Sequence, residues 1–135
     1  MRILLTTAVF ALLIFSGLVA FGQQVSITPV APSGAEVREK VAADIASNYA
    51  KKDYAAVRKD FAKIMLDALS EEKLKSVWED FIAKVGEFQK VLTTTETEKD
   101  GYRVIKKRCQ FASENATIQV TFNEENKVIG LYIKF

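Results

Sequence analysis

The sequence contains no histidine and a single cysteine, Cys109, among its 135 residues. A serine or cysteine nucleophile usually needs a neighbouring histidine as its base, so neither a Ser-His-Asp nor a Cys-His arrangement can be built from this chain. Common zinc sites are excluded as well, because one thiol without imidazoles cannot complete a tetrahedral shell unless carboxylates supply the rest. The sequence therefore predicts no metal and no cofactor, and it favours a protein that is not an enzyme.

Glycine motifs are also missing. The six glycines are scattered singly, so the chain has neither a G-x-S-x-G nucleophile elbow nor a phosphate-binding glycine loop. Cys109 cannot form an internal disulfide, which leaves stability to the core. Because Cys109 lies in a strand-like run, we expect a buried thiol, with pairing to another chain as the alternative.

The first residues have the pattern of an export signal. Arg2 precedes an apolar run over residues 3–15, and Ala20-Phe21-Gly22 places small residues where a signal peptidase reads. We expect residues 1–22 to be a signal peptide cleaved after Gly22, and the protein to be secreted or periplasmic, with an uncleaved anchor as the alternative. Residues 23–33 contain two prolines and no helical period, so they predict an extended linker before a single domain over residues 34–135.

The exported part has balanced charge. Arg2 belongs to the signal, which leaves 18 basic residues against 17 acidic ones. This balance predicts no attraction to nucleic acid, and contact with a membrane only through the signal peptide before cleavage. The basic run Lys106-Lys107-Arg108 is interpreted as a solvated strand face that also discourages edge pairing, with Lys106 and Arg108 on one side and Lys107 on the other.

Helical periodicity fills the first half of the domain. Ser33 and Glu36 have capping-box spacing, which predicts a helix start. Asp53 is a suitable N-cap for a second helix, and a third is predicted over residues 70–86, where Gly86 supplies a left-handed stop. Apolar residues recur at helical spacing in all three: Val37, Val41, Ile45 and Tyr49; then Tyr54, Val57, Phe61, Ile64, Met65 and Ala68; then Leu74, Val77, Trp78, Phe81, Ile82 and Val85.

After Gly86 the hydrophobic period changes to two. Strands are predicted over residues 88–97, 102–111, 116–122 and 127–135, joined by turns into an antiparallel meander. The last strand is apolar on both faces, so we expect it to be central or covered on both sides, and Gly130 within it predicts a bulge or bend. The fold class predicted is α+β, with three N-terminal helices packed on a curved four-stranded antiparallel meander.

A family resemblance accompanies this pattern. It is carried by the run Ala46 to Leu69 with Tyr49, Asp53-Tyr54, Val57, Phe61 and Met65, by Glu72-Lys73-Leu74, Trp78 and Gly86-Glu87-Phe88, and by the closing strand over residues 126–133. These residues resemble the bacterial domain of unknown function 3887. The resemblance implies a cone similar to nuclear transport factor 2 and to cystatins, found in secreted proteins and sometimes beside an α/β-hydrolase. It supplies no catalytic residues.

Tyr49, Tyr54 and Trp78 are the candidate ligand-binding residues. Each joins an apolar body to a polar tip, which suits the mouth of an aliphatic pocket, although aromatic residues at helical spacing are normally core. We expect a secreted non-enzymatic module that binds a small apolar ligand or a protein partner through the helix–sheet cavity or the sheet face. A homodimer through the sheet is a further expectation.

The alternative function is a carboxylate-dependent isomerase or hydratase acting in the same cavity. It needs an acidic side chain inside the fold, where desolvation would raise the carboxyl pKa. The acidic residues fall mostly at helix starts, on polar helix faces and in turns, which predicts solvated carboxylates. Asp53 is expected to be a cap and Asp60 to lie on the polar side of its helix.

Overall fold

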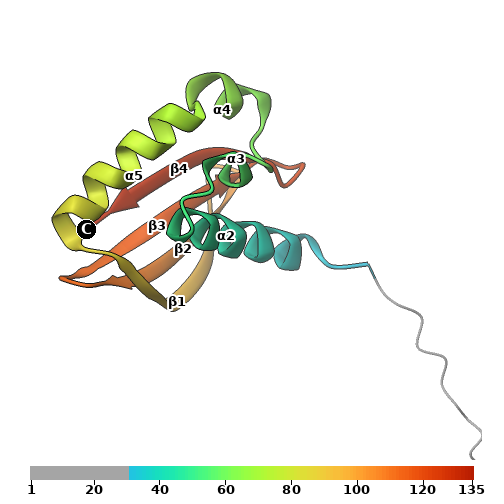
Figure 1. Cartoon of the computed structure of the whole chain (residues 1–135). Helices are drawn as coiled ribbons and strands as arrows, with labels where there is room; N and C mark the ends of the chain where they lie inside the picture. Colours follow the sequence, from blue (N-terminus) through green and yellow to red (C-terminus); the bar gives the residue numbers. More distant parts are fainter. Residues whose placement is uncertain (1–30) are drawn as a thin grey trace, which may run out of the picture. The chain divides into compact units, whose positions relative to one another are not determined.

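All the described helices precede the strands in the chain (Figure 1). The structure, a computed structural model, describes residues 31–135, so the predictions for the signal peptide and for most of the linker lie outside it. The fold is α+β, as predicted. The elements are α2 (Gly34–Ala50), α3 (Tyr54–Val57), α4 (Lys63–Ala68), α5 (Glu71–Val85), β1 (Phe88–Lys99), β2 (Tyr102–Phe111), β3 (Asn115–Phe122) and β4 (Val128–Lys134).

The long helices begin where the capping residues predict. At the start of α2 the Ser33 hydroxyl accepts a hydrogen bond from the Glu36 amide, and the Glu36 carboxylate accepts one from the Ser33 amide. Ser70 caps α5 through the Lys73 amide, and Gly86 ends it with φ 85°. These contacts satisfy backbone groups that a helix end leaves free, so the ends are defined locally.

The predicted second helix is wrong as a continuous element. Asp53 does cap α3, through the Ala56 amide. The helix then stops because the segment around Phe61 pairs with Val128 instead of with its own chain: the Val128 amide donates to the Asp60 carbonyl and the Ala62 amide donates to the Val128 carbonyl, each at 2.9 Å. A new helix, α4, follows. Three side chains predicted for the apolar stripes are exposed: Ile64 (69%) and Ala68 in α4, and Val77 (52%) in α5.

The strands form the predicted meander, in the order β1-β2-β3-β4 with antiparallel neighbours. A register shift opposite Thr121 and Phe122 leaves Ile129 unpaired, which is the bulge expected beside Gly130. The expectation of a central or doubly covered last strand is wrong, because β4 is an edge. The Phe61 bridge covers that edge only near Val128, and the strand is mixed half-buried and exposed from Leu131 onward.

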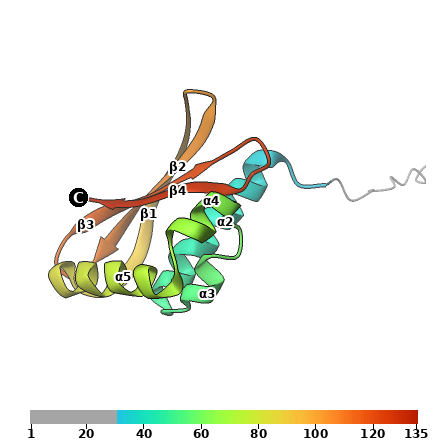
Figure 2. The same cartoon turned by 90° about the horizontal axis from the view of Figure 1, so that it is seen from above.

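The helices pack on one face of the sheet (Figure 2). Alternate strand residues enter the core on this inner face: Ile105, Cys109, Phe111, Ala116, Ile118, Val120, Phe122 and Val128. Cys109 is a free thiol and fully buried, as expected. Lys107 shares its parity, so it points inward and is buried. The prediction of opposite faces for Lys106 and Lys107 is confirmed, but the solvated environment expected for Lys107 is wrong.

Candidate functional site

The three candidate ligand-binding residues lie in the core. Tyr49 and Trp78 are fully buried and stack, with ring centroids 4.5 Å apart, and Tyr54 is buried beside the same cluster. The Tyr54 hydroxyl and the Trp78 Nε1 have no hydrogen-bond partner within the described protein. The interior between helices and sheet is therefore filled by aromatic rings at this point, and the ligand role of the three residues stays a prediction.

An apolar groove lies elsewhere, between α2 and β1. Its volume is about 310 Å³. Small residues of α2 form one wall and two apolar residues of β1 form the other, and because the helix side presents short side chains, helix and strand do not close over each other. The lining residues are Ala43, Ala46, Ser47 and Ala50 of α2, its C-cap Lys51, and Phe88 and Val91 of β1.

The strand beside this groove is an edge of the sheet. β1 pairs only with β2 in the described part of the chain, so the backbone groups of its other side have no strand partner. Register shifts on both sides of Lys90-Val91 break the ladder near the groove, and the pairing is continuous from Thr93 to Lys99. All residues after Phe88 in β1 are exposed. Such an edge can accept a further extended segment.

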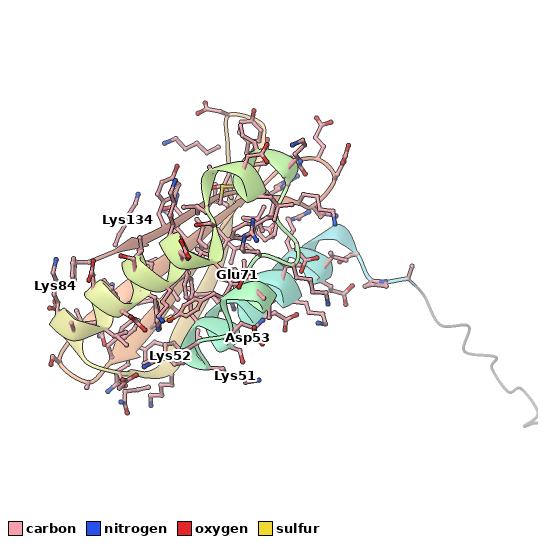
Figure 3. The ribbon with its side chains drawn as sticks, turned by 45° about the horizontal axis from the view of Figure 1, so that its top comes forward. Lys51, Lys52, Asp53, Glu71, Lys84 and Lys134 are labelled. Atoms are coloured by element: carbon pink, nitrogen blue, oxygen red, sulfur yellow. The ribbon has the colours of Figure 1, made fainter. Side chains whose placement is uncertain are left out.

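Polar contacts fix the inner side of β1. Arg38 of α2 forms an ion pair with Glu96 at 2.7 Å and also donates to the Asn126 side chain at 2.8 Å. The Arg38 guanidinium holds the pKa of Glu96 below its ordinary value through this hydrogen bond. Figure 3 shows Lys51 and Lys52 at the end of α2, close to Asp53, the N-cap of α3. The groove thus has a basic residue, Lys51, at its rim.

The carboxylates, the thiol and the possible metal ligands of residues 31–135 bear on the alternative of a carboxylate-dependent enzyme. No aspartate or glutamate is buried there, and Lys107 is the one buried charged residue of the described range. Burial raises the pKa of the Cys109 thiol to about 11, so it is protonated at neutral pH and a poor nucleophile. No group of three His, Cys, Asp or Glu residues in this range is placed to hold a metal ion. The carboxylate-dependent alternative therefore has no buried carboxylate in this part of the chain to act as its base.

Another hollow, of about 400 Å³, lies between two turns of the sheet. It is formed by Asp100, Gly101 and Tyr102 at the first hairpin and by Asn123, Glu124 and Glu125 at the last. Its lining is acidic and polar. The carboxylates there are solvated, as the sequence predicted for turn residues.

The sequence did not predict the groove. The periodicity of α2 identifies the stripe that enters the core, but the small residues on the next side of the helix carry no signal of their own. The one sequence feature that relates to the groove is the spacing of Ala43, Ala46 and Ala50 at intervals of three and four residues. Whether small residues leave a groove depends on which strand lies beside them.

Comparison with known proteins identifies the chain. The family described as protein of unknown function DUF3887 matches residues 42–131. The chain belongs to this family. A solved structure similar to this chain is the NMR structure of a protein from Ruminococcus gnavus ATCC 29149, with a TM-score of 0.55 and 22% sequence identity. The similarity covers 75% of this chain and 93% of that one, and it shows the fold alone. No curated protein matches the chain.

Membership of the DUF3887 family confirms the resemblance seen in the sequence. The match spans the helices from α2 onward and most of the sheet, so it includes both walls of the groove. It names no ligand. Within the described residues no helix is long and apolar enough to cross a membrane.

Proposed function

We propose that this DUF3887 chain is a non-enzymatic binding module that takes an extended segment of a partner protein between α2 and β1. One observation carries the proposal: an apolar groove of about 310 Å³ lies directly beside an unpaired strand edge. The edge offers backbone hydrogen bonds and the groove offers a place for alternate apolar side chains. Peptide recognition by strand addition uses this combination.

We also propose a cone-shaped fold for the domain and export of the protein from the cytoplasm. Helices on one face of a meander, with bulges in both edge strands, support a cone similar to nuclear transport factor 2. Export with cleavage after Gly22 remains part of the proposal. N-terminal sequencing of the protein recovered from outside the cytoplasm is expected to begin at Gln23, and a sequence beginning at Met1 would contradict cleavage.

Peptide selection tests the binding role. Random twelve-residue peptides displayed on phage are selected against the protein, and those that bind are measured by titration calorimetry. Ser47→Trp is expected to reduce their affinity at least about tenfold, because an indole would fill the groove from an exposed position. Ser76→Trp, on the exposed side of α5, is the matched control. Selected peptides that bind Ser47→Trp as well as the parent would contradict the proposal.

A small apolar ligand in the same groove is the second candidate. The volume of about 310 Å³ lies at the lower end of the range for small-molecule sites, and the strand wall, Phe88 and Val91, is apolar. Native mass spectrometry of the gently purified protein is expected to show a bound species that Ser47→Trp loses. A bare mass for the parent protein, together with successful peptide selection, would leave the peptide as the occupant.

A further inference from the structure

The outer face of the sheet, which turns away from the helices, collects positive charge. Side chains alternate between the two faces along a strand, so residues out of phase with the core positions lie on this outer face. The pairing register places five basic residues there, and each is exposed. They are Lys90 and Lys99 of β1, Lys106 and Arg108 of β2, and Lys134 of β4.

No carboxylate of the four strands shares that face. Glu96 lies opposite Ile105, a core position, and contacts Arg38 on the helix side. Glu98 lies opposite Arg103 and is bridged to it, with the same inward parity. None of the five outer cations forms an ion pair with a described residue. The sheet's other acids are in turns, and Asp100, Glu124 and Glu125 line the hollow beside Tyr102 at one end of the sheet. The positive charge of the outer face is therefore concentrated away from that end, at Lys90, Lys106, Arg108 and Lys134.

The cations are close enough to act together. Lys106 and Arg108 are two residues apart on one strand, which is about 7 Å. Arg108, Thr117 and Lys134 form one row across β2, β3 and β4, so Arg108 and Lys134 are separated by about 10 Å. The Debye length at physiological salt is about 8 Å, so neighbouring charges in this group repel one another and jointly attract anions. Figure 3 shows Lys134 at the end of β4.

Two tyrosines accompany the cations. Tyr102 and Tyr132 have outward parity and are 45% and 55% exposed. The Lys134 ammonium lies 5.8 Å from the centre of the Tyr132 ring. Tyrosine joins an apolar ring to a polar tip, and it is enriched where proteins meet the headgroup region of membranes. Thr93, Thr95, Thr117 and Gln119 lie on the same face, beside Lys106 and Arg108 in the register.

We propose that this outer sheet face, defined by Lys90, Lys106, Arg108 and Lys134 with Tyr132, docks on the surface of an anionic lipid bilayer. Charge complementarity selects the occupant, and the arrangement selects a surface: the cations occupy three strands and spread in two dimensions, whereas a linear polyanion is matched by a single stripe. A second copy of the chain would set the same cations against one another. The face lies on the other side of the sheet from the groove, so the two proposals are independent.

Vesicle sedimentation tests the docking surface. Residues 32–135 contain the whole hydrophobic core cluster and form one compact unit, so they are used beside the full chain after their cooperative unfolding is verified. Without the apolar N-terminal run, binding to vesicles of phosphatidylcholine with about 30% phosphatidylglycerol reports on the sheet face. We expect binding to these vesicles, loss on raising the salt, and no binding to pure phosphatidylcholine.

Charge reversal locates the contact. Each cation near an anionic surface contributes about fivefold in affinity, so Lys106→Glu with Arg108→Glu is expected to weaken binding about 25-fold or more. Lys59→Glu with Lys75→Glu makes the same change in net charge on exposed residues of the helical side and is expected to weaken it far less. Equal loss in the two double variants, binding that ignores lipid charge, or binding to soluble polyphosphate without binding to vesicles would each overturn the proposal.

Discussion

The ammonium of Lys107 donates a hydrogen bond to the hydroxyl of Thr94, directly opposite on β1, at 3.0 Å. Lys107 is only 4% exposed and lies between Ile105 and Cys109 on the core face of β2. Thr94 itself is exposed, on an edge strand. A charge inside the sheet therefore depends on a polar partner at the rim, because a buried ammonium is costly unless it is hydrogen-bonded.

Removing the hydroxyl should destabilise the fold. Thr94→Val is expected to lower the free energy of unfolding by about 1.5–3 kcal/mol, because it leaves the Lys107 ammonium without this acceptor. In a Lys107→Met background the same change should cost little. Chemical denaturation of the four proteins measures the coupling, and Thr95→Val on the outer face is the control. The same loss for Thr94→Val with and without Lys107 would show that the contact is not the cause.

Gly86 is required at the end of α5 for two reasons that can be separated. Its φ is +85°, and a Cβ would lie 2.5 Å from the Cβ of Ala112. Gly86→Ala is expected to lower the free energy of unfolding by about 2–4 kcal/mol, from backbone strain and overlap together. Gly101 has φ +84°, and a Cβ there would meet nothing within 4 Å, so Gly101→Ala reports the backbone cost alone, about 1 kcal/mol. Equal losses at the two sites would rule out the contact with Ala112.

The ion pair of Arg38 and Glu96 predicts a pH dependence. The pKa of Glu96 is lowered in the folded protein from its ordinary value of 4.5, so the carboxylate stabilises the fold above that pH. This contribution is lost as the pH falls through the folded-state pKa. Denaturant unfolding between pH 7 and pH 3 should show a smaller acid-dependent loss in Arg38→Met than in the parent.

The control for this pH dependence is Lys40→Met. Lys40 and Asp44 also form an ion pair, at 2.8 Å, but both side chains are well exposed, so solvent screens the interaction. Arg38 additionally binds Asn126, which adds a loss that does not depend on pH. An acid-dependent loss in Arg38→Met as large as that of the parent would show that Glu96 gains nothing from Arg38.

The Tyr54 hydroxyl forms no hydrogen bond with the described part of the protein. The group is buried without a partner in the described part of the chain, and burial raises the pKa of Tyr54 above its ordinary value. Tyr54→Phe is therefore expected to leave thermal stability unchanged or to raise it by up to about 1 kcal/mol, since no protein hydrogen bond is lost. Tyr54→Leu, which also removes the ring, should lower stability. A clear loss of thermal stability in Tyr54→Phe would mean that the hydroxyl forms a hydrogen bond in solution.

Local signals in the sequence determined much of this fold. The capping residues Ser33, Asp53 and Ser70 and the stop at Gly86 define helix ends through contacts within a few residues. The alternation after Gly86 predicted the meander, and its turns place neighbouring strands side by side. The absence of histidine was by itself enough to exclude the common catalytic sets. The helix ends and the meander depend on residues that are close together in the chain, so both can be predicted from the sequence.

Features that depend on residues far apart in the chain were decided only by the tertiary structure. The segment at Phe61 leaves its helix because Val128 pairs with it, and the same strand, β4, is an edge although its composition suggested a covered one. Lys107 is buried because core positions flank it on the face of the sheet that the helices cover. The groove and the cationic outer face also depend on tertiary structure. Hydrophobic periodicity predicts which residues share one face of a helix or strand, but only the packed structure shows which element, or solvent, that face contacts.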